Sequence, residues 1–221
     1  MSTHTRVGLI AAVLTIGGAV AILALLPAAR RPGPEGAASP EEALRIMHEA
    51  LVRGDRERYR ASLTGPDGAL DVLDATFDFA QAGYAFQDRF VATYGQKAWQ
   101  TFQSEKGVPG SKKEGTLNVH LNLPERDGAW LNEVKVQTDG DTARCTAPDA
   151  FAGLQWVKEG PDWRLCAETF GGMGEGHWPE QAKLFRGLAA VVRDMTPRIG
   201  KATPPEEIEK EMAKRLRSSM F

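Results

Sequence analysis

The chain has 221 residues, of which 27 are Lys or Arg and 29 are Asp or Glu, so its formal net charge is −2. The charged residues before Ser39 are Arg6, Arg30, Arg31 and Glu35. The rest of the chain therefore has 24 basic and 28 acidic side chains. A slightly acidic chain of this kind lacks the clustered Lys and Arg of a nucleic-acid surface or a polybasic lipid-binding patch. We therefore expect no nucleic-acid partner.

An uncharged apolar run at residues 7–29 is the strongest indication of location in the sequence. A helix of about 20 apolar residues crosses a hydrocarbon core of about 30 Å, and Val7–Leu26 supplies that length before Pro27. A cleaved signal peptide is one alternative, although its apolar region is shorter and its small-x-small cleavage site is poorly matched here. A buried soluble helix is another. We expect a single-pass membrane anchor at 7–29 behind a tail at 1–6.

The charges that flank this run do not decide its orientation, because Arg6 on one side nearly balances Arg30 and Arg31 on the other. A short basic leader before an apolar segment resembles an uncut secretory signal, which predicts an extracytoplasmic globular domain. Residues 30–38 are rich in Pro, Gly and Ala and are typical of a short flexible tether. The folded part is expected to begin at Ser39.

Two helices are expected directly after the tether. Ser39 has the position of an N-cap, and Glu42 three residues later completes a capping box. Apolar residues then recur at helical spacing until Gly54, which is expected to end the helix. Asp55 can cap a second, shorter helix that carries Leu63.

A longer helical pattern follows the turn cluster at 64–68. Apolar residues recur at helical spacing through 69–95, which predicts one long helix or a pair interrupted at Gly83. Residues 97–103 either extend this helix or form a separate one, and 105–115 are expected to be a loop.

The apolar period then changes from about 3.6 residues to 2. Residues 116–124 alternate apolar and polar side chains, which predicts a strand with one buried face. Two strands are expected in 131–148, joined by a turn at Asp139-Gly140, and two more in 151–169. Helices followed by such strands predict an α+β fold with an antiparallel sheet of about five strands.

Residues 171–221 are expected to begin with a glycine-rich loop and to continue as C-terminal helices. The first of these helices starts near Pro179 and ends at Pro197 and Gly200. The last begins at 203–206, with acidic side chains near its start and basic ones near its end. This order complements the helix dipole.

Two stretches resemble the nuclear-transport-factor-2-like superfamily, to which ketosteroid isomerase also belongs. They are the opening SPEEALRIMHEALVRGDRERYRASL at 39–63, and the strand, DGD turn and Lys-Glu-Gly-x-x-Trp-x-Leu hairpin within 136–166. The resemblance covers residues 39–170 and implies a cone-shaped domain, in which a curved antiparallel sheet wraps around helices and encloses a pocket. Relatives behind a membrane anchor look like binding or accessory domains, whereas others are isomerases, dehydratases or cyclases.

No spacing of His, Cys, Asp, Glu, Ser or Gly matches a catalytic or metal-binding signature, so we expect no cofactor and no metal. The groups to test first as a pocket acid or base are Asp71, Asp78 and His48. Asp71 and Asp78 share one stripe of a helix, which is more typical of a solvated face. For His48 a simple surface position is the better interpretation.

The two cysteines, Cys145 and Cys166, are expected to be free thiols. Pairing across the hairpin turn places Cys145 on the apolar face with Val136, whereas Cys166 shares the opposite face with Arg164. In a meander another strand also separates them, and the resulting distance exceeds the Cα separation that a disulfide spans.

The leading hypothesis is a membrane-tethered, non-catalytic binding or accessory domain that takes a small apolar ligand or a protein partner. The alternative is a small-molecule isomerase or dehydratase that uses a pocket carboxylate or histidine. A third hypothesis is a homo-oligomeric scaffold that associates through the outer face of the sheet. A buried carboxylate in an open pocket would favour catalysis, and an open apolar pocket would favour binding.

Overall fold

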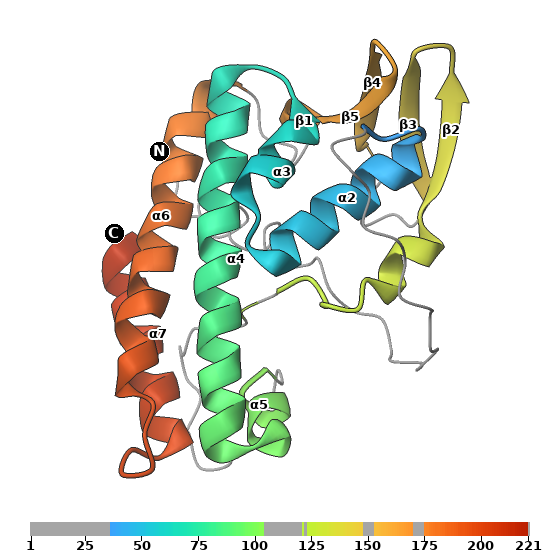
Figure 1. The fold of residues 1–221 in the computed structure, drawn as a ribbon. Coiled ribbons are helices and arrows are strands. Elements are labelled where there is room, and N and C mark those ends of the chain that lie inside the picture. The colour runs from blue at the N-terminus through green and yellow to red at the C-terminus, as the bar shows by residue number, and fades with distance from the viewer. Residues whose placement is uncertain (1–35, 104–120, 122, 148–152, 170–174, 221) are drawn as a thin grey trace. The chain divides into compact units, whose positions relative to one another are not determined.

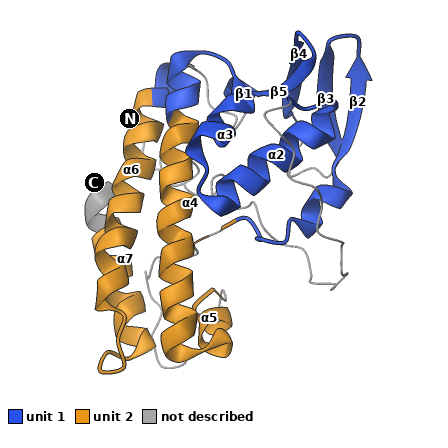
Figure 2. Ribbon diagram, in the orientation of Figure 1, with its two compact units in different colours: residues 1–71, 124–178 blue, residues 72–123, 179–221 orange. Residues whose placement is uncertain are grey.

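The computed structural model describes residues 36–103, 121, 123–147, 153–169 and 175–220. The predicted tail at 1–6, the predicted transmembrane helix at 7–29 and residues 30–35 of the predicted tether lie outside this part. Among the described residues, no helix has the length and apolar character needed to span a bilayer. The chain divides into two compact units (Figure 2): unit 1 comprises residues 1–71 and 124–178, and unit 2 comprises residues 72–123 and 179–221.

Unit 1 combines helices with a five-stranded sheet (Figure 1), so the predicted α+β class is confirmed. Its described elements are α2 (Pro40–Arg53), α3 (Arg56–Ala61), β1 (Leu63–Thr64), the first residues of α4 (Asp67–Tyr94), η1 (Ala129–Glu133), β2 (Lys135–Asp139), β3 (Thr142–Ala147), β4 (Gln155–Glu159), β5 (Asp162–Cys166), η3 (Ala167–Thr169) and η4 (Glu175–His177).

The two predicted helix caps at the start of unit 1 are confirmed. The Ser39 hydroxyl accepts the backbone N–H of Glu42 at 3.2 Å, which caps α2. Gly54 ends α2 in the left-handed region with φ of 73°, where glycine has no side chain to clash. The Asp55 carboxylate then accepts the backbone N–H of Arg58 at 3.0 Å, which caps α3.

The sheet has the order β1-β5-β4-β3-β2, and it is mixed rather than purely antiparallel. The prediction that Leu63 belongs to the second helix is wrong, because Leu63 pairs with Leu165 as part of the parallel strand β1. The chain leaves α3 at Ser62, whose hydroxyl donates to the Tyr59 carbonyl at 2.7 Å. The Ser62 carbonyl accepts the backbone N–H of Leu165 at 3.0 Å, so a partner distant in the sequence converts this segment into a strand.

The predicted strand at 116–124 cannot be followed in full, since 116–120 and 122 lie outside the described residues. Leu121 and Leu123, which are described, do not belong to a strand. The predicted loop at 105–115 and most of the glycine-rich loop that starts at residue 171 also lie outside. The fifth strand of the described sheet is therefore β1.

The other four predicted strands form a meander, in which buried side chains alternate along β3 and β5 as expected, whereas β2 contains no buried residue. Val136 pairs with Cys145 across the β2–β3 hairpin, whose turn includes Gly140 with φ of 60°. β4 separates β3 from β5, as predicted for the strands of the two cysteines. Both cysteines are free thiols, Cys145 buried and Cys166 half-buried.

Unit 2 consists of helices in its described part. These are the rest of α4, α5 (Gln96–Gln103), α6 (Trp178–Met195) from its second residue, η5 (Thr196–Arg198) and α7 (Pro205–Met220). The helix α4 runs unbroken for 28 residues through Gly83. A Cβ atom on Gly83 would lie 2.4 Å from the Leu123 side chain, so this glycine allows close packing rather than a break. Gly95, with φ of 88°, separates α4 from α5.

Aromatic side chains from α4 and α5 fill the core of unit 2. The rings of Trp99 and Phe102 stack at 5.4 Å with 16° between their planes, and Phe90 packs against both. Apolar residues of α6, α7 and the segment between them complete this cluster: Ala189, Val192, Met195, Ile199, Ile208, Met212, Ala213 and Leu216. The Tyr94 hydroxyl lies 3.0 Å from the carbonyl oxygen of Gly200, which ties α4 to the connection before α7.

Candidate functional site

His48 lies on the buried side of α2, and its side chain is only 4% exposed. The prediction of a surface position is therefore wrong. The reason is the helical period: Leu44 is four residues before His48 and Leu51 is three residues after it, and both are buried. This spacing was the signal in the sequence that places the imidazole in the interior of unit 1.

The imidazole is held by a hydrogen bond and by close packing, and we call the group of His48, Glu125, Gly128 and Trp130 the His48 site. Nε2 of His48 lies 2.8 Å from the backbone carbonyl oxygen of Glu125. Because a carbonyl oxygen only accepts, Nε2 carries the proton and donates it. The ring of Trp130 meets the imidazole edge-on, with centroids 5.6 Å apart and planes at 83°.

Gly128 forms the remaining wall of the His48 site. It is buried and has φ of 64°, the left-handed region that favours glycine. A Cβ atom at this position would lie 3.0 Å from Cε1 and 3.1 Å from Nδ1 of His48. The imidazole therefore approaches the backbone more closely than a side chain at residue 128 would allow.

The turn at 125–129 presents its backbone to His48 because it is fixed by its own hydrogen bonds. The Glu125 carbonyl accepts the N–H of Gly128 at 3.2 Å in addition to the bond from the imidazole. The Asp127 carboxylate accepts the N–H of Ala129 at 3.1 Å, which starts η1. The bond partner of His48 is thus a main-chain atom held in position by local turn chemistry.

Burial lowers the pKa of His48 below the ordinary value of 6.5. The hydrogen bond to the Glu125 carbonyl and the nearby carboxylates of Glu49 and Asp127 act in the opposite direction, since they favour the charged imidazolium. Because the desolvation of the ring outweighs them, His48 is a neutral imidazole with Nε2 protonated at neutral pH.

The two predicted aspartates have other surroundings. The Asp78 carboxylate lies 3.3 Å from the Arg193 guanidinium, which joins α4 to α6 within unit 2. Asp71 is half-buried near the start of α4 and belongs to unit 1 together with His48. The three predicted residues therefore do not all fall within one unit.

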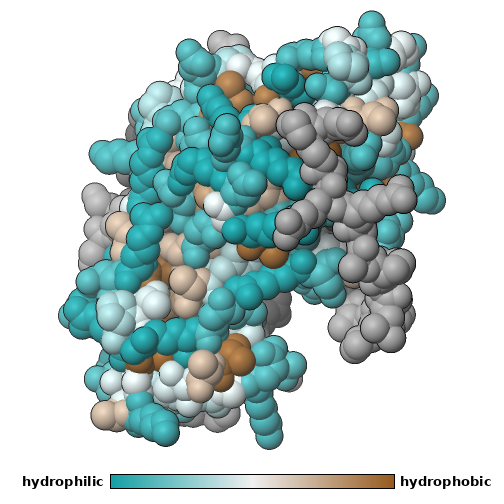
Figure 3. All heavy atoms as spheres, in the orientation of Figure 1, coloured by the Kyte–Doolittle hydropathy of each residue, from teal (hydrophilic) through white to brown (hydrophobic). Residues whose placement is uncertain are grey.

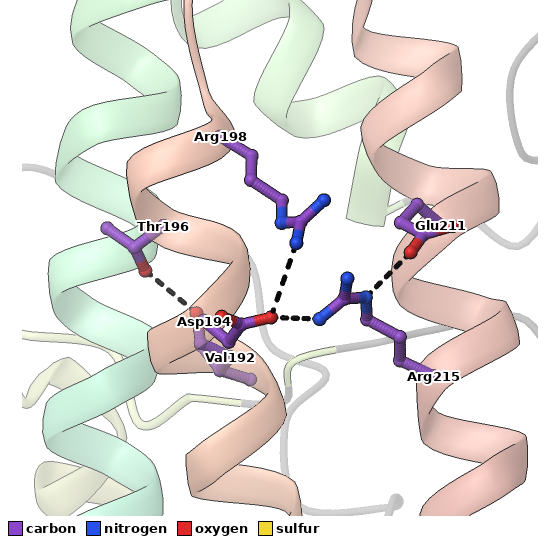
Figure 4. A network of polar contacts seen from close by, with 6 residues as sticks. All are labelled: Val192, Asp194, Thr196, Arg198, Glu211 and Arg215. Carbon is purple, nitrogen blue, oxygen red and sulfur yellow. Dashed lines mark hydrogen bonds and ion pairs between the residues drawn. The ribbon is translucent and has the colours of Figure 1, made fainter.

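A network of charged side chains joins α6, α7 and the segment between them in unit 2 (Figure 4). Arg215 on α7 donates from Nε to the Glu211 carboxylate at 2.7 Å and also contacts the Asp194 carboxylate on α6. Arg198 approaches Asp194 at 3.8 Å. The hydrogen bond from Arg215 lowers the pKa of Glu211. Each arginine faces a carboxylate at the protein surface, so this network fastens α7 to α6 and is not an anion site.

The cysteines are poor nucleophiles. Burial, with smaller contributions from the carboxylates of Glu168 and Glu159, raises the pKa of the Cys166 thiol to about 11. Burial also raises the pKa of Cys145. A thiol must be deprotonated to attack an electrophile, so the raised pKa lowers the thiolate fraction of both side chains near neutral pH.

Within the described part of the chain, no group of three or more His, Cys, Asp or Glu side chains could hold a metal ion. Comparisons of the chain with protein-family models, with curated proteins and with solved structures found no match. The resemblance to the nuclear-transport-factor-2-like superfamily therefore stays a prediction.

The sequence did not predict one buried polar group of unit 1, the indole N–H of Trp156. Trp156 on β4 is 1% exposed, and its indole Nε1–H has no hydrogen-bond partner among the residues that the structure describes. Its neighbours in register on the adjacent strands are Ala143 and Leu165, both apolar and buried. An unpaired buried donor costs about 1–3 kcal/mol, so this indole would gain from any acceptor brought to it.

Proposed function

We propose that this chain is a membrane-tethered, non-catalytic binding or accessory domain whose binding site lies in unit 1. The observation that carries the proposal is the His48 site. The protonated nitrogen of His48 is bonded to a backbone carbonyl and the other nitrogen lies against Gly128. A general acid or base has to reach a proton of its substrate, and this imidazole is occupied as a link between α2 and the turn at 125–129.

Trp156 supports binding as the role of unit 1. A bound molecule with a carbonyl, ether or hydroxyl oxygen would provide the acceptor that its indole N–H lacks. The apolar side chains of Ala143 and Leu165 beside it favour a ligand that is otherwise hydrophobic. We therefore propose a small, mainly apolar ligand with at least one hydrogen-bond acceptor.

The membrane tether is proposed from the uncharged run at 7–29, which has the length of a bilayer span. We place the globular part outside the cytoplasm, on the likeness of the N-terminus to an uncut secretory signal. A carbonate wash of membranes tests the anchor: the full chain should remain, and a variant that lacks residues 7–29 should be released. Protease added to intact cells should then cut the globular part, and protection of that part would contradict its placement.

A homo-oligomer has less support than ligand binding. The outer face of the sheet carries polar side chains, and Arg144 on β3 already bonds to Gln137 on β2 at 3.1 Å. Figure 3 shows one face of the molecule, which is mostly hydrophilic with its hydrophobic atoms in separate small patches. Extensive obligate interfaces are more hydrophobic than this.

Native mass spectrometry of the detergent-extracted full chain tests the binding proposal. We expect the wild type to carry a small molecule, His48→Gln to retain it, and Trp156→Phe to lose it. Circular dichroism of all three proteins controls for folding. Loss of the molecule in His48→Gln but not in Trp156→Phe would overturn the proposal. That result would favour the isomerase or dehydratase alternative, in which His48 contacts the substrate.

A further inference from the structure

The first described residues, 36 and 37, lie beside the first residues of β5. The backbone N–H of Trp163 donates to the Ala37 carbonyl at 2.9 Å, and Ala37 is 4% exposed. A Cβ atom on Gly36 would overlap the Asp162 carboxyl group, so Gly36 and Asp162 lie close together. Residues 36 and 37 are thus held in place where β5 begins.

The next residues continue this attachment into α2. The backbone N–H of Ala38 donates to the Glu42 carboxylate at 2.7 Å, beside the cap formed by Ser39. Residues 36–38, which were predicted as part of the tether, are therefore attached to unit 1. Residues 30–35 alone connect the proposed span to the domain, and even fully extended they reach roughly 20 Å.

The attachment point lies at a defined end of the sheet. β5 begins at Asp162 and β4 ends at Glu159, and the two residues pair directly. In an antiparallel meander the β2–β3 turn lies at the same end as the β4–β5 turn, as Figure 1 shows. The N–H of Lys158 also donates to the Asp141 carbonyl at 2.8 Å. We call residues 139–142 and 159–162 the turn end of unit 1.

We propose that the turn end of unit 1 faces the lipid headgroups, at a distance set by the short tether. This inference rests on the membrane anchor of the proposed function. The turn end carries the carboxylates of Asp139, Asp141 and Asp162, and that of Glu159, which is paired with Arg164 at 3.2 Å. None of its residues is Lys or Arg, the side chains that bind lipid phosphates, so the turn end faces the bilayer without adsorbing to it. The opposite end of the sheet, where β2 and β4 begin, then points away from the membrane toward ligands and partners.

Energy transfer from a fluorophore on the protein to acceptor-labelled lipids tests this orientation. The full chain is reconstituted into phosphatidylcholine vesicles, and one cysteine is added at an exposed site, by Asp141→Cys at the turn end or by Lys135→Cys at the start of β2. Lys135 and Asp139 at the two ends of β2 are about 13 Å apart. The wild type, with its two thiols of raised pKa, is the labelling control. The label is added after reconstitution, so that it marks outward-facing domains.

We expect stronger transfer from residue 141 than from residue 135. Equal transfer, or stronger transfer from residue 135, would overturn the orientation. A flexible Gly-Ser insertion between Pro34 and Glu35 should reduce the difference between the two sites. An unchanged difference would show that the tether does not set the orientation. Release of the chain by a carbonate wash would contradict the anchor itself, which separates failure of the proposed function from failure of the orientation.

Discussion

Unit 1 and unit 2 differ in the polar groups that lie in their cores. Unit 1 buries the imidazole of His48, which is bonded to a backbone carbonyl, and the indole N–H of Trp156, which has no partner in the described part of the chain. Unit 2 buries the polar side chain of Gln181 outside its core cluster, which consists of aromatic and aliphatic side chains, and the network around Arg215 lies at the surface of the unit. Buried polar groups cost stability, and they persist where they serve structure or binding. This contrast is why we place binding in unit 1 and describe unit 2 as a packed helical unit.

The largest effect is expected in the aromatic core of unit 2. Phe90 is fully buried between Phe86, Tyr94, Trp99 and Phe102. Phe90→Ala should lower the free energy of unfolding by about 3–5 kcal/mol, because it leaves a cavity among rigid rings. Urea denaturation of the chain measures the loss, and Phe90→Leu, which keeps most of the volume, is the control.

Hydrogen exchange of the same variant tests the contrast between the units. Faster exchange confined to α4 beyond residue 72, α5, α6 and α7 would support separate cooperative units. Equally accelerated hydrogen exchange in β2–β5 would show that the two units unfold together. The contrast between unit 1 and unit 2 would then not reflect separate cooperative units.

A smaller effect is expected at the wall of the His48 site. Gly128 and Gly140 have almost the same backbone conformation, with φ of 64° and 60°. A Cβ atom at residue 128 meets His48 and Leu131 at 3.0 Å, whereas one at residue 140 has no neighbour within 4 Å. Either substitution by Ala costs about 1–2 kcal/mol in the left-handed region. Gly128→Ala should cost more than Gly140→Ala in thermal unfolding, and equal losses would mean that the His48 site tolerates a side chain there.

The sequence allowed the prediction of features that depend on neighbouring residues. The caps at Ser39 and Asp55 and the β2–β3 turn at Gly140 are fixed by contacts within a few residues, so pattern and composition indicate them. The burial of His48 was also readable from its spacing to Leu44 and Leu51.

Features that depend on distant backbone atoms were not predictable. β1 exists because Leu63 finds Leu165 about 100 residues later, and a strand of two residues has no period to detect. The partner of His48 is the carbonyl of Glu125, a main-chain atom that every residue type carries. Residue identity therefore gives no sign that His48 bonds to residue 125, and the close approach of Gly128 to the imidazole is seen only in the folded structure.

The pH dependence of unfolding should distinguish the buried His48 of unit 1 from an ordinary surface histidine. Burial lowers the pKa of His48 in the folded protein, so the unfolded chain binds the proton more tightly. The free energy of unfolding is therefore highest above the unfolded pKa of about 6.5, and it falls as the pH drops through the lowered pKa of the folded state.

His48→Gln isolates this contribution, because its amide can still donate to the Glu125 carbonyl and does not titrate. The urea midpoint of the wild type should fall between pH 7.5 and pH 5 by more than that of His48→Gln. The other histidines are common to both proteins and cancel in the difference. Parallel loss of stability in the two proteins would place the pH sensitivity outside the His48 site.

The smallest effect is expected at Trp156, where two opposing changes meet. Trp156→Phe leaves part of a cavity, as any large-to-small change in a core does, but it also removes a buried donor without a partner. Trp163→Phe on the neighbouring strand loses the same volume, and the indole nitrogen of Trp163 is not among the buried unpaired atoms of the described residues. Trp156→Phe should therefore lower the urea midpoint less than Trp163→Phe. A larger loss at residue 156 would mean that its indole N–H is bonded in solution, and Trp156 would then no longer indicate a binding site in unit 1.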